Sequence, residues 1–146
     1  MTCSADLLLD TSCAIALLSP DHEAHQLVEE ACQGKTLGLA GHALFETLAV
    51  LTRAPAVKVA LADAVALVED NFFANAWPPG DCAAALPAKL LAAGITGGRV
   101  YDALVGVAAA ESGVTLLTLD RRAKPTYESL GVPYRLLGTA HSSAAA

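Results

Sequence analysis

Four carboxylates stand alone within apolar or uncharged stretches of this 146-residue chain: Asp10, Glu46, Asp102 and Asp120. Asp10, for example, follows a run of leucines and precedes ten residues without a charge. Burial disfavours the ionised form of such a carboxylate unless the group is paired or bound to a metal. Four of them favour a shared purpose, and the best candidate is a cluster that holds a divalent cation.

The residue types also indicate which cation and which chemistry. Four anions gathered in a small volume would raise the pKa of at least one of them, and a hard cation removes that conflict. Oxygen ligands without Cys or His suit Mg²⁺ or Mn²⁺ rather than zinc. Such a site can act on a phosphodiester, because the metal activates water, orients the phosphate and stabilises charge on the leaving oxygen.

Each acid must also be weighed as an ordinary structural residue. Asp10 and Asp120 could cap helices, and Asp102 could lie in a first helical turn that favours negative charge. Glu46 lacks that explanation, because we expect it in the middle of a helix. The four taken together favour one site over four separate structural roles.

The segments that must position these acids alternate between strands and helices. We expect strands over 5–10, 35–40, 73–77, 114–119 and 134–137, and helices over 12–18, 21–33, 41–53, 57–71, 81–93, 100–112 and 121–130. This alternation predicts one α/β domain over 1–138, with a mostly parallel sheet of about five strands flanked by helices. Residues 139–146 form a polar, Ala/Ser-rich tail that we expect to be flexible.

Two prolines fall inside expected helices. Pro87 lies within 81–93 and Pro125 within 121–130, where a proline should kink the helix or mark a restart.

Parallel strands would bring the acids to one edge of the sheet. Sites in open α/β sheets form beyond the carboxyl ends of strands, where the strand order reverses. Asp10 ends the first expected strand and Asp120 follows the fourth. Glu46 and Asp102 would arrive from helices packed against that edge, so we expect all four acids to converge.

Composition and charge limit the partners of the chain. The formal net charge of -6 argues against a generally basic nucleic-acid binder, although it leaves room for a local basic patch. No apolar stretch is long enough for a membrane span. There is no Lys or Arg before Lys35, so we expect no secretory signal and a cytoplasmic location. The four cysteines show no zinc-like spacing.

Four segments carry a resemblance to a known family: Leu8 to Ser12, His42 to Thr47, Gly97 to Ala103 and Leu116 to Arg122. In this order and spacing the chain resembles PIN-domain ribonucleases over about 6–137, and most closely the VapC-type toxins of bacterial toxin–antitoxin systems. The resemblance implies a homodimer, an RNA substrate, a cognate VapB-like antitoxin and a five-stranded parallel sheet. It implies that Asp10, Glu46, Asp102 and Asp120 form the acidic metal-binding set. It also implies that Ser12 or Thr11, and Thr118, assist through their hydroxyl groups.

An acidic site repels RNA, so positive charge must lie nearby. We hypothesise that Arg99 and either Arg121 or Arg122 contact phosphates. The alternative is that these residues are solvated or pair with acids such as Glu128.

Recognition of an unpaired base often uses aromatic stacking, for which Trp77 and Tyr101 are the plausible candidates. Tyr101 is expected in the core rather than as a base platform.

The sequence therefore predicts a Mg²⁺- or Mn²⁺-dependent endoribonuclease, the toxin of a type II toxin–antitoxin pair. Asp10 and Asp102 would bind the principal metal, Asp120 would complete that shell, and Glu46 would hold a second ion or position water. The alternatives are a housekeeping PIN-type nuclease and a catalytically silent module whose acidic cleft binds a basic peptide. A phosphoacceptor domain fits poorly, because Lys124 falls inside a helix rather than after a late strand.

Overall fold

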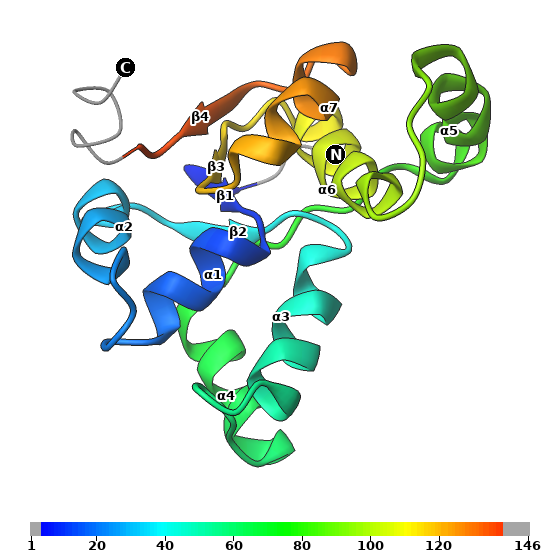
Figure 1. The fold of residues 1–146 in the computed structure, drawn as a ribbon. Coiled ribbons are helices and arrows are strands. Elements are labelled where there is room, and N and C mark those ends of the chain that lie inside the picture. Colours follow the sequence, from blue (N-terminus) through cyan, green and yellow to red (C-terminus); the bar gives the residue numbers. More distant parts are fainter. Residues whose placement is uncertain (1–3, 139–146) are drawn as a thin grey trace.

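The computed structural model of the protein describes residues 4–138 (Figure 1). Four strands in this range form one parallel sheet with the order β2-β1-β3-β4. The strands are β1 (Leu7–Leu9), β2 (Leu37–Leu39), β3 (Leu116–Thr118) and β4 (Tyr134–Leu136). The predicted α/β class with a parallel sheet is confirmed, whereas the predicted tail at 139–146 lies outside the described residues.

Helices cover both faces of the sheet, as Figure 1 shows. The described residues form α1 (Thr11–Leu18), α2 (His25–Cys32), α3 (Ala43–Arg53), α4 (Leu61–Asn71), α5 (Gly80–Ala93), α6 (Arg99–Ser112), the 3₁₀ helix η1 (Arg121–Ala123) and α7 (Lys124–Ser129). Within this range no helix combines the length and the apolar character that a bilayer crossing requires.

The two faces of the sheet bury two separate cores. Successive strand residues point to opposite faces, so Leu8 and Leu9 enter different cores. Leu9 packs with α1 to α4, whereas Leu8 packs with α6 and with Tyr127 of α7. The short leucine strands are therefore buried on both sides, as expected for a parallel sheet covered by helices.

The segment 73–77, predicted as a fifth strand, adds only a single parallel bridge, between Ala40 and Ala76. The side chain of Asn75 accepts a hydrogen bond from the backbone N–H of Leu39 at 2.7 Å and so replaces a main-chain partner. Gly38 permits this close approach, because a Cβ there would collide with the carbonyl group of Ala74. The sheet therefore has four strands in the described residues, with this segment alongside β2.

The two prolines differ in their effect: no restart occurs at Pro87, whereas the helix predicted over 121–130 is divided into η1 and α7 next to Pro125. The helix α5 runs without interruption through Pro87. Pro87 is exposed, so water can satisfy the carbonyl group that loses its helical partner. Pro125 lies at the start of α7, where a proline costs no hydrogen bond, and the preceding turn is η1.

Candidate active site

The crevice between the carboxyl ends of β1 and β3 is the point where the strand order reverses. From β1 the chain passes to β2 on one side and later to β3 on the other. Asp10 directly follows β1, and Asp120 lies two residues after β3. Both acids therefore lie where open α/β sheets form their sites.

A pocket of about 100 Å³ opens at this crevice. It is lined by Asp10, Thr11, Ser12, Glu46, Asp102, Val105, Asp120 and Tyr127. The structure thus brings together all four acids singled out from the sequence. Glu46 lies in the first turn of α3 rather than mid-helix as expected, and Asp102 lies in the first turn of α6. The helix dipole can therefore favour either negative charge, so Glu46 has the same structural explanation as Asp102.

Asp10 is buried and tightly held. Its Oδ1 accepts hydrogen bonds from the Ser12 hydroxyl at 2.5 Å and the Cys13 backbone N–H at 3.2 Å. Its Oδ2 accepts one from the Tyr127 hydroxyl at 3.2 Å. Burial raises the pKa of Asp10, and these contacts, together with a hydrogen bond from Thr118, oppose the rise only in part. The pocket therefore disfavours a bare carboxylate at this position.

Burial and neighbouring charges also raise the pKa values of Asp102 and Glu46. Burial, followed by the charges of Asp120, Asp10 and Glu46, raises the pKa of Asp102 to about 6. Burial also raises the pKa of Glu46, against the opposing charge of His42. This repulsion is the conflict that a bound cation would remove.

Two hydroxyl groups connect the ends of β1 and β3. The Ser12 hydroxyl, which donates to Asp10, also accepts from the backbone N–H of Leu119 at 3.0 Å. The Thr118 hydroxyl accepts from the backbone N–H of Asp120 at 3.0 Å. Ser12 and Thr118 thus hold the two aspartates in position, while Thr11 lines the pocket.

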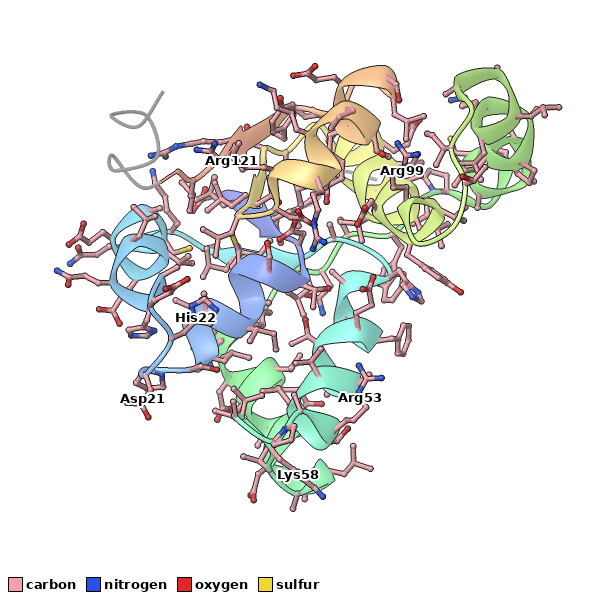
Figure 2. All side chains as sticks on the ribbon, in the orientation of Figure 1. Asp21, His22, Arg53, Lys58, Arg99 and Arg121 are labelled. Carbon is pink, nitrogen blue, oxygen red and sulfur yellow. The ribbon has the colours of Figure 1, made fainter. Side chains whose placement is uncertain are left out.

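The basic residues differ in their relation to the pocket. The Asp120 Oδ1 accepts from the Arg122 backbone N–H at 2.9 Å and lies 3.4 Å from Arg122 Nε. Arg99 is exposed at the start of α6. Arg121 lies well apart from Arg99 in Figure 2, so the two do not form one basic patch. Arg122 thus pairs with Asp120, whereas Glu128, considered above as a partner for these arginines, lies 3.8 Å from Lys124 Nζ.

The donor set fits Mg²⁺ or Mn²⁺ but is not arranged as a closed metal shell. Within residues 4–138 no three Asp, Glu, His or Cys side chains approach closely enough to form a ready set of ligands. The ligands available in the pocket are carboxylate oxygens from four acids. Mg²⁺ typically retains several waters and uses only one or two carboxylates, so an open acidic pocket suits it.

Two features of the site were missed or misjudged from the sequence. Tyr127 contacts Asp10 from α7, and its position in a short amphipathic segment carried no signal of that contact. Tyr101, expected in the core, is 51% exposed and stacks on His42. His42 lies 3.9 Å from Glu46, and the i,i+4 spacing of these two residues was the available clue.

Comparison with known proteins identifies the class. A family model described as the PIN domain matches residues 7–128, so the chain belongs to the PIN-domain family.

Within that family the relatives carry VapC names. Ribonuclease VapC27 of Mycobacterium tuberculosis (strain ATCC 25618 / H37Rv) is 46% identical over 127 residues, which cover 86% of this chain and 93% of the relative. Ribonuclease VapC40 of the same organism is 37% identical over 130 residues, covering 88% and 96%. The resemblance to VapC-type members noted from the sequence is confirmed.

Proposed function

We propose that this chain is a Mg²⁺- or Mn²⁺-dependent endoribonuclease that hydrolyses RNA phosphodiester bonds as the toxin of a type II toxin–antitoxin pair. The observation that carries the proposal is the convergence of four carboxylates at the switch point of a PIN-family sheet. The similarity to proteins named ribonucleases supports the same chemistry.

We assign different roles to the four acids according to their positions in the pocket. Asp10 and Asp102 would hold the principal cation, and Asp120 would complete or orient that shell. Glu46, which reaches the pocket from the first turn of α3, would hold a second ion or position the attacking water. Asp10 is the most firmly positioned, because Ser12, Cys13 and Tyr127 all donate hydrogen bonds to it.

The reaction requires a water molecule placed in line with the scissile phosphate. A bound divalent cation would lower the pKa of that water and stabilise charge on the phosphate and the leaving oxygen. The residues of the chain supply the positioning: Ser12 and Thr118 fix the aspartates at the ends of β1 and β3. Burial raises the pKa of Glu46 above its usual value, which makes its carboxylate a better acceptor of a proton from water.

Substrate phosphates would be held at the rim of the pocket. Arg99 and Arg122 are the candidates, because both are exposed and flank acids of the pocket in sequence, whereas Arg121 lies apart from Arg99 (Figure 2). Filter binding across a salt series tests this: Arg99→Ala should weaken RNA binding and reduce the salt slope by about 1. Arg53→Ala, at the far end of α3 in Figure 2, is the matched control and should change neither.

The assembly follows the VapC pattern. We expect a homodimer whose surface includes α1 and the segment from Val57 through α4, acting in the cytoplasm with a cognate VapB-like antitoxin. Co-purification of a small DNA-binding protein encoded by the adjacent upstream reading frame would support the toxin assignment. Absence of such a frame would favour a housekeeping PIN nuclease.

The decisive experiment combines expression with cleavage. Induction of the wild type should arrest growth, and sequencing of RNA 5′ ends after brief induction should reveal new ends at defined sites. Asp10→Asn should abolish both, with its circular dichroism spectrum unchanged. Purified wild type should lose cleavage in EDTA and regain it with Mg²⁺ or Mn²⁺.

The competing assignment is a silent acidic cleft that binds a basic peptide. It predicts no new RNA ends, and growth arrest that persists in both Asp10→Asn and Asp102→Asn. That combination would contradict the nuclease mechanism.

A further inference from the structure

Two pairs of rings lie beside the acidic pocket and are together called here the aromatic row: Tyr101 with His42, and Phe45 with Trp77. Tyr101 and His42 stack with centroids 4.9 Å apart and an interplanar angle of 17°. Phe45 and Trp77 lie 5.8 Å apart with an angle of 48°. His42 and Phe45 are three residues apart at the start of α3 and therefore share a face, which joins the two pairs.

The aromatic row is exposed in a chain that otherwise uses few aromatics. In the described residues the exposed aromatic side chains are Phe45, Phe73, Trp77 and Tyr101, and three of these four belong to the row. Their exposed fractions are 53% for Phe45, 50% for Trp77 and 51% for Tyr101. Such a gathering of exposed rings on one surface is a mark of a binding site.

The row begins at the acids of the pocket. His42 Nε2 lies 3.9 Å from Glu46 Oε1, and Tyr101 directly precedes Asp102 in the first turn of α6. Because His42 places one end of the row beside Glu46, a nucleotide next to a phosphate at the acids would lie near these rings.

The chemistry of the rings favours a nucleobase as the occupant. The near-parallel Tyr101 and His42 pair offers flat faces, and bases stack on aromatic faces irrespective of sequence. Tyr, His and Trp also carry polar groups at their edges, which suit the polar edges of a base better than an aliphatic protein surface does. A base paired in a duplex is already stacked on its neighbours, so only unpaired bases can use these rings.

We propose that the aromatic row stacks the bases on either side of the scissile phosphate. This inference rests on the proposed nuclease function, and it assigns substrate positioning to Tyr101, His42, Phe45 and Trp77.

The test uses Trp77, the single tryptophan of the chain, as a fluorescent reporter. Full-length protein in EDTA, where no cleavage proceeds, is titrated with a short single-stranded oligoribonucleotide. Trp77 emission should be quenched in a saturable manner. An abasic oligonucleotide of the same length, which has phosphates but no bases, should quench weakly, and so should the same sequence annealed into a duplex.

Variants locate the binding on the row. Tyr101→Ala should raise the Kd for the single strand by about five- to 150-fold, the range for loss of one base–aromatic stack. Tyr101→Phe, which keeps the ring, should bind within about two-fold of wild type, since stacking uses the ring face. Phe73→Ala is the matched control, because Phe73 is a 74% exposed aromatic outside the row and should leave binding and cleavage unchanged.

The outcomes separate this inference from the nuclease proposal. If wild type cleaves RNA but Tyr101→Ala shows the wild-type Kd, KM and cleavage sites, the base-stacking role is wrong while the nuclease stands. Tyr101→Ala that binds RNA normally but shifts from dimer to monomer in sedimentation would assign the row to a protein interface instead. If wild type binds the single strand through the row but never cleaves in Mg²⁺ or Mn²⁺, the nuclease proposal fails while the row remains.

Discussion

The acidic pocket and a larger apolar groove at the other end of α3 are built in different ways. The apolar groove, of about 280 Å³, is lined by Leu18, Ser19, Pro20, Asp21, His22, Leu51, Ala56, Val57, Val59 and Leu67. It lies between the end of α1, the last turns of α3 and α4, whereas the pocket of about 100 Å³ draws on β1, α3, α6 and the segment after β3. Figure 2 shows Asp21 and His22 at the corner after α1, away from Arg99 at the start of α6.

The difference lies in how each region treats its carboxylates. Asp21 in the groove is exposed, so water solvates its charge. Asp10 in the pocket is 5% exposed, and its negative charge contributes to the raised pKa values of Glu46 and Asp102. Buried like charges are tolerated only where something compensates them. The comparison teaches that converging, partly buried charge, rather than cavity size, distinguishes the proposed active site from the groove.

The largest expected effect is loss of a proposed metal ligand in the pocket. Asp102→Asn should abolish detectable RNA cleavage while leaving the fold intact, because it keeps shape but removes a charged oxygen ligand. Asp21→Asn makes the same chemical change in the groove and should cleave like wild type. Initial rates with a fluorescent RNA measure both, and equal loss in the two variants would break the comparison.

The next effect concerns the hydrogen bond that holds Asp10. Tyr127→Phe removes the hydroxyl that donates to Asp10 Oδ2 and should lower Mg²⁺ affinity or cleavage about 10- to 100-fold. Tyr134→Phe is the control, since its hydroxyl donates to Glu128 at 2.6 Å rather than to Asp10. Activity over a Mg²⁺ series separates a change in metal affinity from a change in kcat. Identical dependence of activity on Mg²⁺ in the two variants would show that the hydrogen bond from Tyr127 to Asp10 affects neither metal binding nor cleavage.

A smaller effect is expected on stability as the pH changes without divalent cations. The pKa of Asp102 rises from 3.8 to about 6 on folding, so the folded state binds this proton more tightly than the unfolded state. Its stabilising contribution is therefore complete below 3.8 and lost as the pH rises through about 6. The loss should be about 1 kcal/mol, because solvent screens a half-buried carboxylate.

Urea denaturation in EDTA across this pH range measures that effect. Asp102→Asn cannot ionise at this position, so its free energy of unfolding should depend less steeply on pH than that of wild type. The remaining pH dependence should come from Asp10 and Glu46, whose pKa values are also raised. A slope that is the same in wild type and Asp102→Asn would assign the pH dependence elsewhere.

The smallest effect is expected in the groove itself. Val59→Ala removes two methyl groups from a half-buried side chain and should cost about 1 kcal/mol of stability. Cleavage per chain should stay at the wild-type level, measured at a concentration where sedimentation shows the same assembly for both proteins. A fall in kcat at matched assembly would show that the groove is coupled to the pocket.

Much of the fold and the acidic site could be predicted from the residues in order. Short leucine-rich strands alternate with amphipathic helices along the chain, and this alternation indicates a parallel α/β sheet. The helices could be recognised because their apolar residues recur with the period of a helix and not with that of a strand. The solitary acids Asp10, Asp102 and Asp120 were visible because a charge in an apolar run is costly wherever that run folds. Glu46 was identified for a partly wrong reason, since α3 starts late enough to place it in a first turn.

The remainder depended on contacts between distant segments. A sequence pattern cannot show that Tyr127 contacts Asp10, 117 residues away. Nor can it show that the side chain of Asn75 accepts a hydrogen bond from the backbone of Leu39 in β2. The sequence also led us to expect Tyr101 in the core, whereas it is exposed. Its place next to an acid on a helix does not show whether another part of the chain packs over the ring. Packing between helices decides such exposure, and packing is a property of the assembled fold.

The sequence by itself determined the class of the fold, the acids and the kind of cation they suit, because periodicity and the cost of buried charge act locally. Only the tertiary structure decided that the acids share one small pocket while the larger groove stays apolar. It also decided that His42 meets both Tyr101 and Glu46 and that Phe45 meets Trp77, because strand order and helix packing determine which distant side chains come together.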